Sequence, residues 1–401
     1  MKRLAVLILS VILAIPASAQ FRDRNPRPEF IWDAGFEYDF DNREFDTGGN
    51  AFSHSMTINA ARLSPSAGIL LRDGKCLSHR LMLGVDIMKD FGDNPVGDGD
   101  GSLENTDLFR EITFSYSIRY ADRRNIFEGR AGIFPRSLAK GEYGDEFISD
   151  SLRFYDNNIE GLLLQWRRPR SYYEVGFDWP GKIGHLRRER FMVFSYGNTD
   201  ITSWLSAGWA ANIYHFANTA EYRGVVDNIL AEPFVRIHVP ISWLQKADVT
   251  TAFVTGYQND RIHSDDVMIP RGGMLTVSAM KWNIGIDNRF YYGTSLMPLY
   301  DDIDDGGNKY GSLLYYGSPF YRVHKSGAWD RGGAADRLEI YYTKNISGIL
   351  GVRLSAYLHF ADGGDGFAFQ GWRQRISLLF DLNGITEKNG DTSRHARSRR
   401  M

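Results

Sequence analysis

Alternation of apolar and polar residues along extended segments is the feature that most constrains how this chain can fold. In residues 30–40, FIWDAGFEYDF, every even position is apolar, whereas the odd positions include Asp33, Glu37 and Asp39. A period of two indicates a β-strand with one apolar and one polar face. A soluble sheet buries its apolar face, whereas a barrel in lipid turns that face outward, so this segment alone leaves both fold classes open.

The same alternation recurs through the chain, for example in residues 81–87 and 111–120, and we count about sixteen such segments. Most span 8 to 12 residues. A strand of a soluble protein has a typical length of about 5–6 residues, whereas a tilted strand needs about 9–11 residues to cross a bilayer. The segment lengths therefore favour strands that cross a membrane. After residue 20, no apolar run is long enough for a membrane helix.

The connections between these segments alternate in length. Short connections are predicted at 121–125, 168–171, 198–202 and 345–348, and long ones at 91–107, 135–158, 259–271 and 294–336. In an antiparallel barrel, successive connections lie at opposite ends, so this alternation places tight turns at one rim and long loops at the other. We therefore predict an all-β fold, a transmembrane antiparallel β-barrel of about sixteen strands, with fourteen or eighteen as alternatives.

The two ends of the chain differ from the barrel segments. Residues 1–19 combine Lys2 and Arg3, an apolar run and a small-residue A-x-A site, which predicts a cleaved signal peptide. The barrel would then span residues 20–383, and 384–401 would form a basic, flexible tail. The single cysteine, Cys76, cannot form an intramolecular disulfide, and the net charge of -2 argues against nucleic acid as a partner.

The last predicted strand has Trp372, Ile376 and Phe380 on one face, opposite Arg373 and Arg375, and has an aromatic residue near its end. In this the chain resembles porin-like outer-membrane β-barrel proteins of Gram-negative bacteria, whose last strand typically ends in an aromatic residue read by the barrel assembly machinery. The resemblance implies residence in the outer membrane, a periplasmic location for the tail, contact with outer-membrane lipid, recognition by that machinery, and often a homo-oligomer. It also implies passive diffusion of small polar or charged solutes through the lumen.

If the apolar faces point to lipid, the charged residues opposite them line the lumen, where water or paired charges can solvate them. The bases among them are arginines, whose planar guanidinium holds a fixed geometry against carboxylates. The candidate lumen and selectivity residues are Asp33, Glu37, Asp39, Glu111, Arg119, Glu128, Arg130, Arg167, Glu174, Asp178, Arg236, His238, Asp287, Arg289, Arg353, Arg373 and Arg375. The same phase adds Arg80, Asp86, Glu232, Arg337 and Glu339.

Two long connections are candidates for a role inside or above the barrel. Residues 135–158 occupy the place where porins fold a loop inward, so the resemblance implies a constriction; the alternative is a surface cap. The candidate constriction residues are Glu142, Asp145, Glu146, Asp150 and Asp156, which would face the lumen arginines. The aromatic residues of 294–336 could stack on sugar rings, but we expect them to pack the loop or plug the barrel mouth.

No motif with catalytic or metal-ligand spacing is present, so we expect no cofactor, no metal and no enzymatic activity. The aspartate runs at 93–100 and 301–305 lack the ligand spacing of a Ca²⁺-binding loop and are interpreted as solvated turns. Beside the porin-like channel, three alternatives stay open. These are a closed barrel that binds surface partners or glycans through its loops, a membrane-embedded hydrolase that uses His238 or His359, and a soluble all-β protein.

Overall fold

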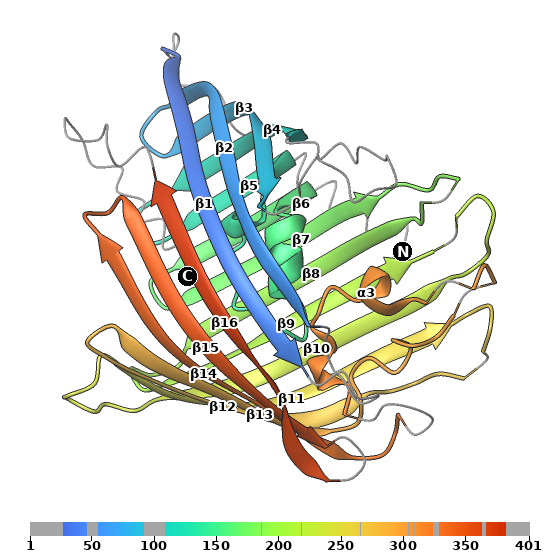
Figure 1. Ribbon diagram of the computed structural model, residues 1–401. Helices are drawn as coiled ribbons and strands as arrows, with labels where there is room; N and C mark the ends of the chain where they lie inside the picture. Colours follow the sequence, from blue (N-terminus) through green and yellow to red (C-terminus); the bar gives the residue numbers. More distant parts are fainter. Residues whose placement is uncertain are drawn as a thin grey trace.

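The computed structural model describes residues 27–45, 55–91 and 109–381, except 186, 218, 265, 304, 308, 324–328 and 363–365. The predicted signal peptide and the basic tail lie outside these residues. In the described part, sixteen strands form a closed barrel in which each strand pairs antiparallel with its neighbours in sequence (Figure 1). The ring closes where β1 pairs with β16, and this confirms the predicted all-β antiparallel barrel of sixteen strands.

The strands are β1 (Glu29–Phe45), β2 (Met56–Asp73), β3 (Leu77–Asp90), β4 (Phe109–Ala121), β5 (Ile126–Pro135), β6 (Asn158–Arg168), β7 (Ser171–Gly181), β8 (Arg190–Asp200), β9 (Leu205–Phe216), β10 (Val226–His238), β11 (Lys246–Asp260), β12 (Arg271–Lys281), β13 (Ile284–Gly293), β14 (Gly333–Ile346), β15 (Leu350–Asp362) and β16 (Phe367–Asp381). The helical segments are η1 (Arg136–Leu138), α2 (Asp150–Tyr155), α3 (Gly311–Leu314) and η2 (Pro319–Tyr321). None of the helices in the described part is long and apolar enough to cross a bilayer.

Strand β2 differs from its prediction. Its sequence alternation is clear only over residues 51–63, whereas the strand runs from Met56 to Asp73 and passes through Pro65. Proline cannot donate a ladder hydrogen bond, and it is tolerated in strands only at edges or interruptions. Here the pairing of β2 with β3 is interrupted between Leu63 and Ser66, which removes the need for a donor at position 65.

The connections sort by length as predicted, apart from the link 363–366 between β15 and β16, which is short but lies at the same end as the long loops. Short links, at 74–76, 122–125, 169–170, 201–204, 239–245, 282–283 and 347–349, lie at what we call the short-loop end. At the opposite, long-loop end are the two connections that matter most below, 136–157 and 294–332. Because every strand runs between these two ends, the position of an inner-face residue in its strand shows how far it lies from the short-loop end.

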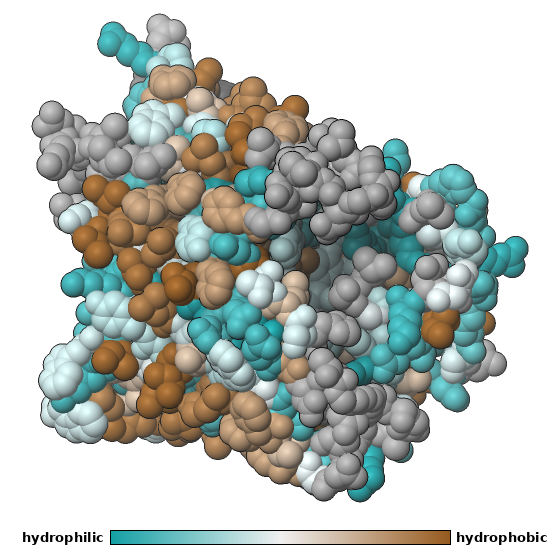
Figure 2. Space-filling model, in the orientation of Figure 1, coloured by the Kyte–Doolittle hydropathy of each residue, from teal (hydrophilic) through white to brown (hydrophobic). Residues whose placement is uncertain are grey.

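The outer face of the barrel is apolar, and the inner face carries the charges. Leu81 and Leu83 on β3 are 57% and 63% exposed, whereas Asp39 and Asp41 on β1 are 2% and 1% exposed. Apolar side chains gather over the outer faces of β1 and β14–β16 (Figure 2). A large apolar outer face is unfavourable in water. The barrel therefore has the polarity of a protein embedded in lipid.

Much of the lumen beside β8–β14 is filled by protein. Residues 143–148 and 296–323 form one buried apolar cluster with the inner faces of these strands. We call residues 296–323 the aromatic plug, since Tyr310, Tyr315, Tyr316, Phe320 and Tyr321 in it are at most 6% exposed. The expectation that these aromatic residues pack inside the barrel mouth is confirmed, and the stacking of glycans on these five side chains is wrong because none of them is accessible.

Candidate functional site

The connection 136–157, which we call the inner loop, enters the lumen from the long-loop end and is tied to β7 at its start. The backbone N–H groups of Lys140 and Gly141 each donate to the Glu174 carboxylate at 2.8 Å. Arg136 forms an ion pair of 2.8 Å with Asp178. Two acids of one strand therefore fix the direction in which the loop leaves the wall.

Acids of the inner loop meet arginines that project from the opposite wall. Glu142 pairs with Arg236 on β10 at 2.6 Å, and Glu146 pairs with Arg289 on β13 at 2.8 Å. Asp145 pairs with Arg337 on β14. Asp156 lies 3.6 Å from Arg136, which belongs to the inner loop itself and not to a strand. The loop thus crosses the lumen as a bridge of ion pairs.

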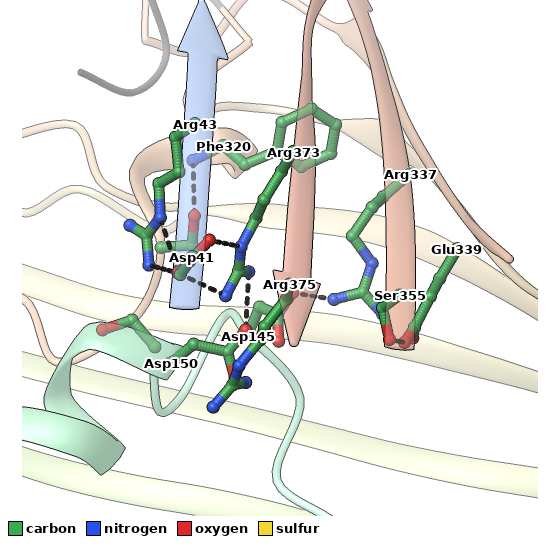
Figure 3. Close-up of polar contacts among 12 residues, drawn as sticks. Asp41, Arg43, Asp145, Asp150, Phe320, Arg337, Glu339, Ser355, Arg373 and Arg375 are labelled. Atoms are coloured by element: carbon green, nitrogen blue, oxygen red, sulfur yellow. Dashed lines mark hydrogen bonds and ion pairs between the residues drawn. The ribbon is translucent and has the colours of Figure 1, made fainter. Parts of the chain in front are cut away.

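The most connected of these contacts is made by α2. Asp150 forms ion pairs with Arg373 at 2.6 Å and with Arg375 at 3.0 Å, and both arginines belong to β16 (Figure 3). Arg373 also donates twice to Asp41, at 2.6 and 2.8 Å, and Arg375 donates twice to Asp39, at 2.9 and 2.8 Å. We call these five residues the Asp150 cluster. Since each guanidinium has two carboxylate partners, the buried charges are compensated.

The other side of α2 packs against β2 and β3. Phe154 is 2% exposed and forms a small apolar cluster with Ile58, Ala60 and Met88. Arg62 pairs with Asp86 and also donates to the backbone carbonyl of Phe154. Ser149 is the N-cap of the helix, and its hydroxyl accepts a hydrogen bond from the backbone N–H of Leu152 at 3.2 Å. α2 therefore lies across the lumen side of β16, β1, β2 and β3.

Arg62 and Asp41 were not among the residues singled out from sequence. Asp41 continues the odd phase of Asp33, Glu37 and Asp39, so extending that alternation to the end of β1 would have found it. Arg62 lies on the inner face of β2 within a predicted segment of mostly small and apolar residues, where one charged position carries little signal. Both proved to hold α2 to the wall, directly or through Arg373.

A cavity of about 200 Å³ remains between the inner loop and the β1–β7 wall. Its lining comes mainly from the halves of these strands nearest the short-loop end. The charged residues that line it are Asp33, Arg80, Arg119, Glu128, Arg130, Lys140 and Arg167. Toward the long-loop end, the same strands carry the partners of α2. The helix and its contacts therefore lie between the β1–β3 side of the cavity and that end, whereas Pro135 and Asn158 line the cavity at the long-loop ends of β5 and β6.

The remaining predicted lumen residues lie on inner faces, several of them in local pairs. Arg130 pairs with Glu128 at 2.5 Å and Arg353 pairs with Glu339 at 2.5 Å. Asp287 accepts from Ser278 at 2.6 Å and lies 3.5 Å from Arg337. Glu111 accepts from Asn158 at 2.8 Å, and Glu37 is half-buried on β1.

His238 lies in a constellation that resembles a hydrolase triad. Its Nδ1 is 2.8 Å from Asp248, and its Nε2 is 3.4 Å from the Ser206 hydroxyl. However, Ser206 is completely buried, and a hydroxyl without solvent exposure cannot reach a substrate unless its neighbours move. His359 is packed among aromatic rings, 4.8 Å from that of Phe320. Neither histidine therefore presents an accessible nucleophile and base.

No group of three or more His, Cys, Asp or Glu side chains in the described ranges could hold a metal ion. The aspartates at 93, 98 and 100 and the one at 304 lie outside those ranges.

Hydrogen bonds attach the aromatic plug both to the inner loop and to the barrel wall, where Gln258 of β11 donates to the carbonyl of Leu296 at 2.7 Å. The backbone N–H of Ser149 donates to the carbonyl of Tyr316 at 2.7 Å, which joins the plug to the inner loop. At the long-loop end, His263 lies 2.8 Å from Asp305 and 3.0 Å from Asp260. The hydrogen bond with Asp305, together with Asp260, raises the pKa of His263 above its ordinary value. A protonated His263 can donate to both carboxylates at once.

No protein-family model and no curated protein matches this chain. Among solved structures it is similar to OmpT, an outer membrane protein of Vibrio cholerae, at 8% identity and a TM-score of 0.48, over 90% of this chain and 100% of the other. It is also similar to OccD3 of Pseudomonas aeruginosa, at 11% identity and a TM-score of 0.46, over 90% of this chain and 94% of the other. A third is a triple mutant of the Rhodopseudomonas blastica porin, at 11% identity and a TM-score of 0.43, over 88% of this chain and 100% of the other.

Proposed function

We propose that this protein is an outer-membrane barrel of a Gram-negative bacterium, exported by a cleaved signal peptide. In this proposal it acts as a porin-like channel for passive diffusion of small polar or charged solutes. The short-loop end then faces the periplasm and the long-loop end faces outward. The observation that carries the proposal is the charged cavity along the β1–β7 wall, because an interior meant only to be closed has no need of an unfilled space lined by ionised groups.

The outer surface supports the membrane location. Trp204, Trp243 and Trp282, in short links, are 51%, 62% and 76% exposed. Lys281 lies 4.9 and 4.2 Å from the ring centres of Trp243 and Trp282. At the long-loop end, Tyr292 is 60% exposed. Exposed aromatic residues at both rims of an apolar belt are typical of barrels whose rims lie at lipid headgroups.

The contacts of the inner loop support its role as the constriction. It places carboxylates opposite arginines from four different strands, and a solute that passes along the β1–β7 wall must pass α2. Fixed charges of both signs across a narrow passage orient polar solutes and select among ions. In this proposal α2 is the narrowest point, and the cavity is the chamber on its periplasmic side.

The test is ion conductance of the full-length protein in planar lipid bilayers. A channel gives discrete current steps that require a folded barrel, checked by the heat-dependent mobility of the same preparation in gel electrophoresis. Folded protein that inserts into the bilayer without passing current would refute the channel. Native protein that is soluble without detergent would refute the membrane location.

A closed barrel that acts through its external loops is the second candidate, and the aromatic plug favours it. The buried cluster fills the lumen beside β8–β14, and α2 covers β1–β3. If the folded protein passes no current, this is the function that remains. The same experiment therefore decides between the two candidates.

A further inference from the structure

We propose that the cavity along the β1–β7 wall binds a small organic anion, one that joins an anionic group to an apolar body. The inference rests on the proposed function, because it names the solute class that the chamber on the short-loop side of α2 would hold. It goes beyond that function in assigning a binding site where a general diffusion channel needs only a passage.

Cations dominate the cavity because four consecutive strands each point one arginine into it. These are Arg80 on β3, Arg119 on β4, Arg130 on β5 and Arg167 on β6. Lys140 of the inner loop adds a fifth positive charge, against the carboxylates of Asp33 and Glu128. All five residues are at least partly exposed, and Arg167 is the most exposed of them. The excess of positive charge in a confined space concentrates anions there.

Contacts hold three of the five cations in place. Arg130 is fixed by Glu128 at 2.5 Å, and Arg167 lies over the ring of Tyr172 at 5.7 Å. Lys140 donates to the carbonyl of Ser137 at 2.8 Å. Guanidinium groups positioned in this way can donate two parallel hydrogen bonds to one anionic group without first losing much side-chain freedom.

Part of the remaining lining is apolar, beside neutral polar side chains such as Ser66, Thr113 and Gln165, and the apolar part sets the class of the anion. Met82, Ile133 and Leu138 line it together with the ring of Tyr172. A fully hydrated inorganic ion gains nothing from such a wall, whereas an aryl or alkyl group does, at about 25 cal/mol per Å² of apolar surface removed from water. The volume of about 200 Å³ lies below the roughly 300–1,000 Å³ of pockets that bury drug-sized ligands, so the solute is small.

The experiment is isothermal titration of the full-length protein in detergent with two probes of matched shape. Benzenesulfonate carries the negative charge, and benzenesulfonamide is neutral near pH 7. Wild-type protein should bind benzenesulfonate at least about tenfold more tightly than benzenesulfonamide, since hydrogen bonds to a charged group exceed neutral ones by roughly that factor. Acetate, which lacks the apolar body, should bind more weakly than benzenesulfonate.

The variant that tests the site is R119Q/R167Q, which should lose about tenfold or more in benzenesulfonate affinity while benzenesulfonamide binding changes little. R110Q/R261Q is the matched control, because it also removes two positive charges, and Arg110 and Arg261 pair with Asp90 and Asp227 outside the cavity. R119K/R167K keeps the charge, so it should retain the preference for the anion even if R119Q/R167Q folds poorly.

Equal affinity for the two probes, or undiminished benzenesulfonate binding in a folded R119Q/R167Q variant, would overturn the inference. The proposed function fails separately. Folded protein that binds benzenesulfonate selectively but passes no current retains the binding site and loses the channel. Protein that conducts but shows no preference for the anion retains the channel and loses the binding site.

Discussion

The substitution D150N tests whether α2 is held in the lumen by charge. Asp150 is the only carboxylate that the helix offers to β16, and it contacts Arg373 and Arg375 at 2.6 and 3.0 Å. Asparagine keeps the shape of the side chain and one acceptor oxygen but removes the negative charge. The arginines keep Asp41 and Asp39, so the wall should stay intact while the helix loses its anchor.

The size of the effect follows from the two contacts. A hydrogen bond to a charged group contributes about 1.5–3 kcal/mol and a neutral one about 0.5–1.5 kcal/mol. Because the amide nitrogen of asparagine cannot accept a hydrogen bond, one of the two contacts is lost and the other is no longer made to a carboxylate, which weakens the docking of α2 by about 2–3 kcal/mol. At about 1.4 kcal/mol per factor of ten, the undocked population should rise by about 30- to 150-fold.

Amide hydrogen exchange of residues 150–155 measures this directly, because exchange in a locally opening segment reports the free energy of opening. In D150N, protection of these amides should fall by about 30- to 150-fold, and single-channel current in planar bilayers should rise. Amides of β1 and β16 should keep their protection. The control E29Q removes the exposed pair between Glu29 and Arg72 and should change nothing, since such pairs contribute about 0–1 kcal/mol.

The reasoning is refuted if D150N folds and its α2 amides exchange within about threefold of wild type. In that case the packing of Phe154 would hold the helix without help from the Asp150 cluster.

Three further outcomes follow from the structure. F154A should weaken α2 docking by up to about 3–5 kcal/mol, the cost of emptying a buried phenylalanine site; faster exchange of residues 150–155 with an intact barrel checks it. The protonated His263 is favoured by the fold, so the stability that it lends the plug is fully present below its ordinary pKa and is lost as pH rises through the raised value. The protection factors of amides near Asp305, corrected for the pH dependence of intrinsic exchange, should therefore be lower at pH 8 than at pH 5.5. H263Q should remove this difference. Finally, fluorophosphonate should not label Ser206, and a stoichiometric adduct would restore the hydrolase alternative.

Several features of the fold were predictable because they depend on local periodicity. The alternation of β1 placed Asp39 on the inner face. The alternation of link lengths showed which connections lie at each end of the barrel. The phase of β2 was readable only as far as Pro65, where the interruption of its pairing with β3 breaks the pattern that a sequence can show. Periodicity therefore predicted which face of each strand points inward and the order of the strands, but it did not predict where the pairing of two strands is interrupted.

The candidate site was predictable only as a set of charges. Sequence placed acids in the inner loop and arginines on the strands, but Arg373 meets Asp41 across 332 positions and Asp150 across 223. Whether the loops lie above the barrel or within it was also undecided. The tyrosines of the plug suit either place, and they are buried because β8–β14 offer an apolar inner face to pack against.

By itself, the sequence determined that this chain forms strands with one apolar and one polar face, since alternation with a period of two is a local property of each segment. The segment lengths and the alternation of link lengths then favoured an antiparallel barrel with the apolar face outward. Tertiary structure alone decided which charges are neighbours and how much of the lumen stays empty. Closure of β1 on β16 brings Asp39 and Asp41 beside the two arginines that hold α2. The cavity then remains along β1–β7 because the inner loop and the plug fill the lumen beside the other strands.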